Sequence, residues 1–171
     1  ECILHWADLE QHIADIAGEM LVIAMGGDAA FLTALKALAP NSMWRAATMP
    51  RAGDDARRLE ALMALSRETG VPLLATNDPL YAVPEDRPLH DVLTCIREGT
   101  VIAEAGKRLL PNAERHVKSP AEMERLFAAC PDALAATSDL LSRIDFTLDQ
   151  LRYEYPHEPV PEGWDPQDWL E

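Results

Sequence analysis

The sequence has 171 residues, of which 48% are hydrophobic and 26% charged, and this composition is typical of one globular domain rather than of a disordered chain. Its formal net charge is −14, with 29 acidic residues against 15 basic ones, which argues against a surface that holds duplex DNA through clustered Lys and Arg. The longest apolar run, residues 20–25, is too short to cross a bilayer, and the three cysteines (Cys2, Cys95 and Cys130) have the spacing of neither a zinc site nor a disulfide framework. We therefore expect a protein of the cytoplasm.

The first third of the chain predicts alternating helices and strands. Residues 6–17 have apolar residues at helical spacing, and residues 20–25 (MLVIAM) are expected to form a strand that is buried on both faces. Asp28 is placed to cap a helix that runs to about Leu38, and residues 43–49 (MWRAATM) predict a second strand. The expected inward stripe of the helix after Asp28 consists of Phe31, Leu32, Leu35 and Leu38.

The helix from Asp54 to about Thr69 is the clearest predicted element, and Gly70 follows it as a stop signal. Its expected buried face consists of Ala56, Leu59, Leu62, Met63 and Ser66. Residues 71–76 (VPLLAT) then predict a third strand. Strand, helix, strand, helix and strand with short connections favour an α/β fold with parallel crossovers. Three strands are too few to close a barrel, so they predict an open sheet or one arc of a barrel.

The second half of the chain is expected to be mainly helical. A helix at about residues 89–98 ends at Gly99, and residues 100–118 are expected to be irregular. Residues 119–122 (SPAE) form a capping box that predicts a helix over 120–128. A further helix opens at Pro131 and ends near Arg143, with Leu134, Leu141 and Ile144 expected to face inward.

The C-terminal stretch has the composition of a linker. From Arg152 onward the sequence is rich in proline and acidic residues, and Asp165 then has the sequence context of a helix N-cap. Because a helix start lies so close to the last residue, we expect this sequence to be a piece of a longer chain.

Basic and histidine residues give weak functional signals. Arg51, Arg57 and Arg58 lie close together, but two aspartates lie among them, so a solvated helix face is favoured over a phosphate site. The five histidines do not form an HxH or an HExxH motif. His116 lies in a predicted loop, where bonding to the backbone explains it as well as a functional role does.

Asp78 is the main candidate for site chemistry, and two interpretations of it remain open. It follows a buried strand, and α/β proteins bind ligands at the carboxyl ends of their strands, so Asp78 could be a metal ligand. A second ligand would be expected two residues later, where the chain has Leu80. Alternatively, Asn77 and Asp78 form an Asx-type turn before Pro79 by bonding local backbone amides. His90, at the start of a predicted helix, is the other candidate ligand.

Four sequence blocks resemble a known family. They are residues 73–81 (LLATNDPLY), 88–99 (PLHDVLTCIREG), 112–127 (NAERHVKSPAEMERLF) and 146–161 (FTLDQLRYEYPHEPVP). In this order they resemble the error-prone, damage-inducible type of bacterial DNA polymerase III alpha subunit. The resemblance covers residues 54–171 well and residues 1–53 only weakly.

The resemblance implies a position for this chain within a larger enzyme. Residues 1–150 would be the later part of its N-terminal polymerase-and-histidinol-phosphatase (PHP) domain, a (β/α)7-type barrel, and residues 151–171 a linker into the polymerase core. The family's HxH motif would lie before Glu1 and the polymerase aspartates beyond Glu171. The last metal-binding motif of the family is D-x-H, and this sequence matches it only at Asp78, because Leu80 stands where the family has histidine. His90 would at most lie behind a metal ligand and support it. The parent enzyme would use Mg²⁺ and bind template-primer DNA, dNTPs and other replication or repair subunits. It would not bind a membrane.

Three hypotheses for function follow. In the first, the chain is a mainly structural PHP-domain part of an error-prone DNA polymerase and contains no catalytic centre. In the second, the intact PHP domain is a metal-dependent phosphoesterase or a 3′–5′ exonuclease with Asp78 as a ligand. In the third, the chain is a free-standing acidic α/β module that binds a protein partner, for example through its proline-rich residues 156–166.

Overall fold

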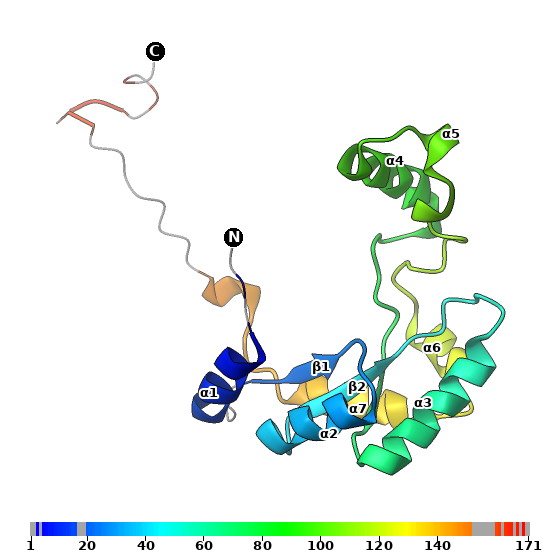
Figure 1. Ribbon diagram of the computed structural model, residues 1–171. Coiled ribbons are helices and arrows are strands. Elements are labelled where there is room, and N and C mark those ends of the chain that lie inside the picture. Colours follow the sequence, from blue (N-terminus) through cyan, green and yellow to red (C-terminus); the bar gives the residue numbers. More distant parts are fainter. Residues whose placement is uncertain are drawn as a thin grey trace.

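A computed structural model describes residues 3, 5–16, 20–151, 160–161, 163–165, 167 and 169 (Figure 1). The elements that surround the sheet are α1 (Trp6–Ile16), β1 (Val22–Ala24), α2 (Ala29–Leu38), β2 (Met43–Ala47), α3 (Asp55–Thr69), β3 (Leu73–Ala75), α6 (Pro120–Leu126) and α7 (Pro131–Ser142). Between β3 and α6 lie η1 (Pro84–Asp86), α4 (Arg87–Glu98), α5 (Ile102–Ala105) and η2 (Gly106–Arg108), and η3 (Leu148–Gln150) follows α7. No helix in the described ranges is long and apolar enough to cross a membrane.

The described strands form one open parallel sheet in the order β1-β2-β3. Val22 pairs with Met43 and Arg45 pairs with Leu73, so each strand lies beside its sequence neighbour. The helices α2 and α3 connect the strands, which confirms the α/β crossovers predicted from the alternating pattern.

The first strand differs from the prediction. It was expected to be buried on both faces, but the Ile23 side chain is 41% exposed and only Ala24 is buried. The difference lies in coverage by helices, because β1 and β3 both lie at an edge of the described sheet and α7 packs against β3. By contrast, all three residues of β3 are buried, as a strand covered on both faces requires.

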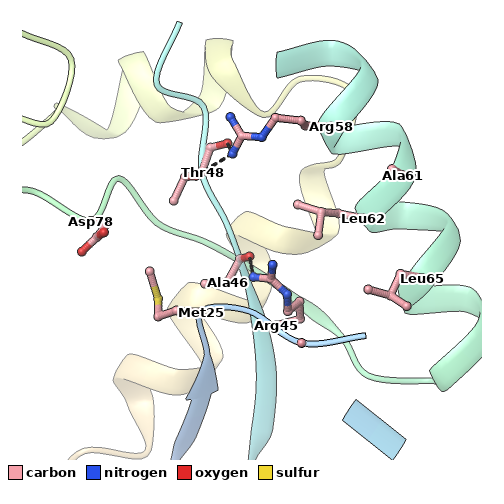
Figure 2. A pocket seen from close by; sticks show the side chains of 10 residues that line it. Met25, Arg45, Ala46, Thr48, Arg58, Ala61, Leu62, Leu65 and Asp78 are labelled. Carbon is pink, nitrogen blue, oxygen red and sulfur yellow. Dashed lines mark hydrogen bonds between the residues drawn. The ribbon is translucent and has the colours of Figure 1, made fainter. Parts of the chain in front are cut away.

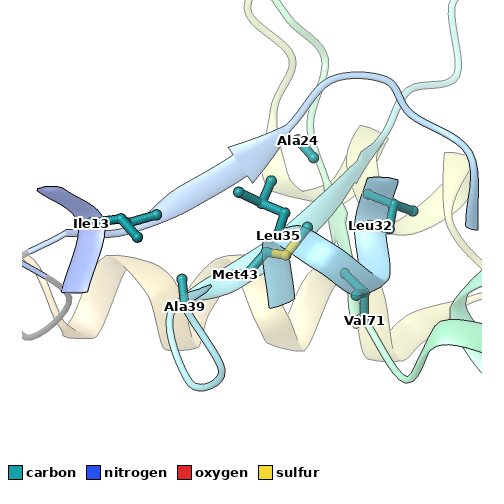
Figure 3. Packing of buried hydrophobic residues seen from close by; sticks show 7 residues of the cluster. All are labelled: Ile13, Ala24, Leu32, Leu35, Ala39, Met43 and Val71. Atoms are coloured by element: carbon teal, nitrogen blue, oxygen red, sulfur yellow. The ribbon is translucent and has the colours of Figure 1, made fainter. Parts of the chain in front are cut away.

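One hydrophobic cluster lies between the sheet and the two N-terminal helices (Figure 3). Its members are Ile13, Ala24, Leu32, Leu35, Ala39, Met43 and Val71. Asp28 caps α2 as predicted, since its carboxylate accepts a hydrogen bond of 2.9 Å from the Phe31 amide. Of the predicted inward stripe of α2, Leu32 and Leu35 are buried in the core, whereas Phe31 is 41% exposed.

The helix α3 has the ends that the sequence predicts. Asp54 is its N-cap, and Gly70 ends it with φ +66°, a backbone conformation that glycine adopts without a Cβ penalty. Leu59 is buried and Leu62 half-buried, but Ala56 is exposed, so the buried face begins one turn later than expected.

A second cluster joins β3 to α3, α6 and α7. Its buried members are Ala47, Leu59, Leu73, Ala75, Phe127, Cys130 and Ala133. Thr137 of α7 donates a hydrogen bond of 2.8 Å to the Ala75 carbonyl oxygen. Leu141 and Ile144, which were expected to face inward, are 68% and 46% exposed, because the three-residue strand β3 covers only the first part of this helix.

Two segments lie outside these clusters. Residues 100–118 were expected to be irregular, but they contain α5 and η2, which are too short to produce a periodic pattern. Figure 1 shows α4 and α5 standing away from the sheet, joined to it by two extended segments. The predicted linker falls largely on residues 152–159, outside the described residues, while Asp165 accepts a hydrogen bond from the Gln167 amide, as its N-cap role predicts.

Candidate functional site

The candidate site begins where the chain leaves β3. Asp78 has φ +44°, a left-handed conformation that Asp and Asn tolerate better than most residues. Its amide donates to the Thr76 hydroxyl at 3.2 Å, so Thr76 forms the local turn bond. The side chains of Asn77 and Asp78 instead reach a segment almost forty residues later in the sequence. Asx-type bonding to local amides, one of the two interpretations of these residues, is therefore wrong.

That later segment is joined to the strand end by side-chain and backbone bonds. Arg115 donates from Nε to the Asp78 carbonyl oxygen at 2.8 Å, and its Nη2 forms an ion pair with the Asp78 carboxylate. Asn77 donates from Nδ2 to the Glu114 carbonyl oxygen at 2.9 Å and to that of His116. The resulting connection between residues 77–81 and 114–117 is called the latch below.

Two backbone bonds complete the latch. The Leu80 amide donates to the Arg115 carbonyl oxygen at 2.8 Å, and the Val117 amide donates to the Tyr81 carbonyl oxygen at 3.2 Å. Tyr81 and His116 thereby form a parallel bridge. The latch fixes the two segments that lead to α4 and α5.

A charged network lies beside the latch. The Lys118 side chain is fully buried, and its Nζ lies 2.7 Å from Glu114 Oε2 and 3.5 Å from Glu122 Oε1. Arg51 pairs with the same two carboxylates, at 3.2 Å and 3.7 Å. A buried ammonium group of this kind requires paired carboxylates to offset its lost hydration.

The network lowers the pKa of Glu114. Burial alone raises the pKa of this carboxyl, but the hydrogen bond and charge of Lys118, together with the charges of Arg51 and His116, outweigh burial and hold the pKa below its ordinary value. The His116 ring is placed by its Nδ1, 2.8 Å from the Ala113 carbonyl oxygen, so its backbone bonding agrees with the loop interpretation.

Sequence reasoning missed this network, although a signal for it exists. Glu114, Lys118 and Glu122 are spaced four residues apart, but Glu114 and Lys118 fall in a stretch that was predicted to be irregular. The capping box predicted at residues 119–122 shares only Glu122 with this network. Ser119 does accept a hydrogen bond from the Glu122 amide at 3.3 Å, but the Glu122 carboxylate pairs with Lys118 and Arg51.

A pocket of about 490 Å³ lies near the carboxyl ends of the strands, between β2 and α3 (Figure 2). Arg45 Nη1 donates to the Ala24 carbonyl oxygen at 3.2 Å, and Arg58 Nη2 donates to the Thr48 hydroxyl at 3.1 Å. Burial, and then the charge of Arg58, lower the pKa of Arg45 below its ordinary value. Both guanidinium groups thus bond to oxygens at the ends of β1 and β2.

The arginines of the predicted basic cluster are divided among different roles. Arg57 is 84% exposed, which fits a solvated helix face. Arg58 pairs with Asp55 at 3.3 Å in addition to bonding Thr48, and Arg51 belongs to the charged network.

The two candidate metal ligands lie in different environments. Asp78 also lines the pocket, but its carboxylate is paired with Arg115. His90 lies on α4, with its ring centroid 5.7 Å from that of Tyr81. In the part of the chain that the structure describes, no three His, Cys, Asp or Glu side chains form a group that could hold a metal ion. A single carboxylate that is already neutralised by a guanidinium does not fit a divalent cation.

Comparisons with known proteins give close relatives. No protein-family model matches the chain. It is 47% identical over 167 residues, 95% of its length, to the error-prone DNA polymerase of Brucella abortus, and 47% identical over 177 residues, its whole length, to that of Bradyrhizobium diazoefficiens. The error-prone DNA polymerase of Caulobacter vibrioides is 45% identical over 166 residues.

These matches cover the chain almost completely but the relatives only in part. The chain spans about 15% of the length of each of these three polymerases. Over that length, identity of 45–47% leaves no doubt about common ancestry. The chain is therefore homologous to a segment of error-prone DNA polymerases.

Proposed function

We propose that this chain is a mainly structural part of an error-prone DNA polymerase that carries out damage-tolerant DNA synthesis, with its nucleotidyl-transfer centre in another part of the same enzyme. The observation that carries this proposal is the homology of the whole chain to about 15% of error-prone DNA polymerases. As such a part, it acts in the cytoplasm, where the parent enzyme binds template-primer DNA, dNTPs and other replication or repair subunits.

Within that enzyme, we propose that residues 1–150 are the later part of the PHP domain and that residues 151–171 lead into the polymerase core. The three parallel strands would then be one arc of a barrel, and β1 would pair with a strand from outside these residues. The edge position of β1 in the described sheet supports this proposal, because an edge strand offers unpaired backbone N–H and C=O groups to a further strand.

The pairing of Asp78 with Arg115 favours a structural role over a metal-dependent phosphoesterase or exonuclease. The guanidinium supplies the positive charge that a metal ion would otherwise supply beside this carboxylate. In the parent enzyme, Mg²⁺ would serve the polymerase centre. Asp78 and Arg115 would serve to hold the latch closed.

The test uses the intact polymerase chain from the same organism and its Asp78→Asn variant. We expect both to extend a primer at closely similar rates in Mg²⁺, and we expect no stoichiometric Zn²⁺ or Mn²⁺ that the substitution removes. Tightly bound metal that is lost on substitution of Asp78, together with metal-stimulated hydrolysis of a phosphoester, would favour the phosphoesterase. Absence of primer extension by the intact chain would contradict the polymerase assignment itself.

A further inference from the structure

The helix α4 exposes its apolar side. Four large aliphatic residues, Leu89, Val92, Leu93 and Ile96, occupy positions i, i+3, i+4 and i+7 of the helix, and their exposed fractions are 63%, 42%, 55% and 71%. At this spacing they form a single stripe along the helix. We call this surface the α4 stripe.

The other side of α4 is the buried one. Thr94 and Cys95 are only 3% and 5% exposed, and α4 contacts α5, where Ala105 is 3% exposed. This is the reverse of an ordinary surface helix, which buries its aliphatic stripe and exposes its small and polar residues. Within the part of the chain that the structure describes, the α4 stripe is therefore left exposed.

The position of α4 adds to this observation. Figure 1 shows the helix standing away from the sheet, on an arm whose two connecting segments are joined by the latch. Arg115 and Asp78 hold the base of the arm, while Val101 and Ile102, at the start of α5, are 58% and 54% exposed. The molecule thus fixes the base of an arm that carries exposed aliphatic residues.

An apolar surface of this kind indicates a contact. Burial of aliphatic area is favourable in proportion to the area removed from water, and soluble proteins seldom leave a whole helix stripe exposed. Permanent contacts are more apolar than transient ones, and the α4 stripe has the aliphatic composition of a permanent contact.

We propose that the α4 stripe docks against another segment of the same polymerase chain, outside these 171 residues. This inference rests on the proposed function. Since the chain spans about 15% of its relatives, most of such a polymerase would lie outside these residues and could cover the stripe. A segment of the same chain has a high effective concentration, which favours it over a separate partner.

The test is cysteine accessibility in the intact polymerase. Ile96→Cys places a thiol on the stripe, and Arg97→Cys places one on the neighbouring position, whose side chain is also 71% exposed here. Each folded variant is treated with a maleimide reagent, and modification of the new cysteine is followed by fragment-ion mass spectrometry, which distinguishes it from the buried native Cys95 beside it. We expect Cys at position 96 to react at least about tenfold more slowly than Cys at position 97.

Each outcome decides between alternatives. Slow reaction at position 96 that persists on dilution supports docking within one chain, whereas protection that disappears on dilution points to a second copy and overturns it. Equal rates at the two positions in an enzyme that extends primers would overturn the docking and leave the proposed function intact. An intact chain that cannot extend primers would remove the proposed function and this inference with it.

Discussion

At the scale of single residues, the strand-end aspartate combines a strained backbone with an ion pair. Asp78 has φ +44°, and its carboxylate pairs with Arg115, which also bonds the Asp78 carbonyl oxygen. The Asp78 side chain is 45% exposed, so solvent screens this pair and limits its contribution to stability. The backbone conformation and the ion pair can be separated by substitution. Asp78→Asn keeps a residue that tolerates the left-handed conformation but removes the charge, and we expect a loss of about 0.5–1 kcal/mol in the free energy of unfolding. Asp78→Ala removes both features and should cost about 1 kcal/mol more, because alanine tolerates the left-handed conformation less well than aspartate or asparagine does. Urea unfolding of the three proteins measures both differences. An alanine variant as stable as the asparagine variant would mean that the turn is not strained. The second residue-scale prediction concerns Glu114, whose pKa lies below its ordinary value in the folded protein because of Lys118 and Arg51. A carboxyl with a lowered folded pKa contributes stability above its unfolded pKa and loses that contribution as the pH falls through the folded value. We therefore expect the free energy of unfolding to fall as the pH drops below about 4.5, the region in which glutamate titrates in unfolded chains. The Glu114→Gln variant should be less stable at neutral pH and show a smaller acid dependence. A parallel shift of the whole pH profile would show that Glu114 does not titrate in this network.

At the scale of elements, α3 provides a direct test of how the helix packs. The sequence placed Leu59 and Leu62 on the same buried face, but the structure distinguishes them: Leu59 is 3% exposed and belongs to the second cluster, whereas Leu62 is half-buried beside the pocket. Leu59→Ala should cost about 2–5 kcal/mol, because it leaves a cavity among residues that cannot close over it. Leu62→Ala should cost clearly less, since solvent in the pocket can occupy part of the space. Chemical denaturation of the two variants checks this order, and equal losses would mean that α3 is rotated relative to the sheet.

The lengths and end signals of the elements explain which of them could be predicted from the sequence. Long elements with a stripe and two end signals, such as α3 between Asp54 and Gly70, were located to within a residue or two. The helix α5 was missed because four residues cannot show a helical period. The inward direction of Leu141 was wrong because sequence spacing identifies a common face but not whether anything covers it.

At the scale of the whole molecule, two surfaces of the described residues are open to association. The strand β1 lies at an edge of the described sheet, and α4 exposes its stripe. An unpaired strand edge and an apolar helix face both favour association with other chains. We therefore expect the isolated 171-residue piece to unfold at a lower temperature than the intact polymerase and to self-associate at concentrations at which the intact enzyme remains monodisperse. Sedimentation velocity and thermal unfolding of the two proteins measure these properties, and the Ile96→Lys variant of the piece, beside Arg97→Ala as a control, should reduce the association selectively. A piece that is monomeric and as stable as its parent would show that these residues are complete as a domain.

The sequence by itself determined the order of helices and strands around the sheet, the parallel α/β connections, the principal helix caps and the resemblance to error-prone polymerases. These features depend on local signals, such as hydrophobic periodicity and the residues that form caps and turns, or on short sequence segments that resemble those of relatives. Only the tertiary structure decided what Asp78 contacts, since its partner Arg115 lies 37 residues further along the chain. It also decided that Lys118 is buried between two carboxylates and that the α4 stripe is exposed among the described residues. The physical reason is that ion pairing and burial depend on which distant segments the fold brings together, and the spacing of residues along one segment does not carry that information.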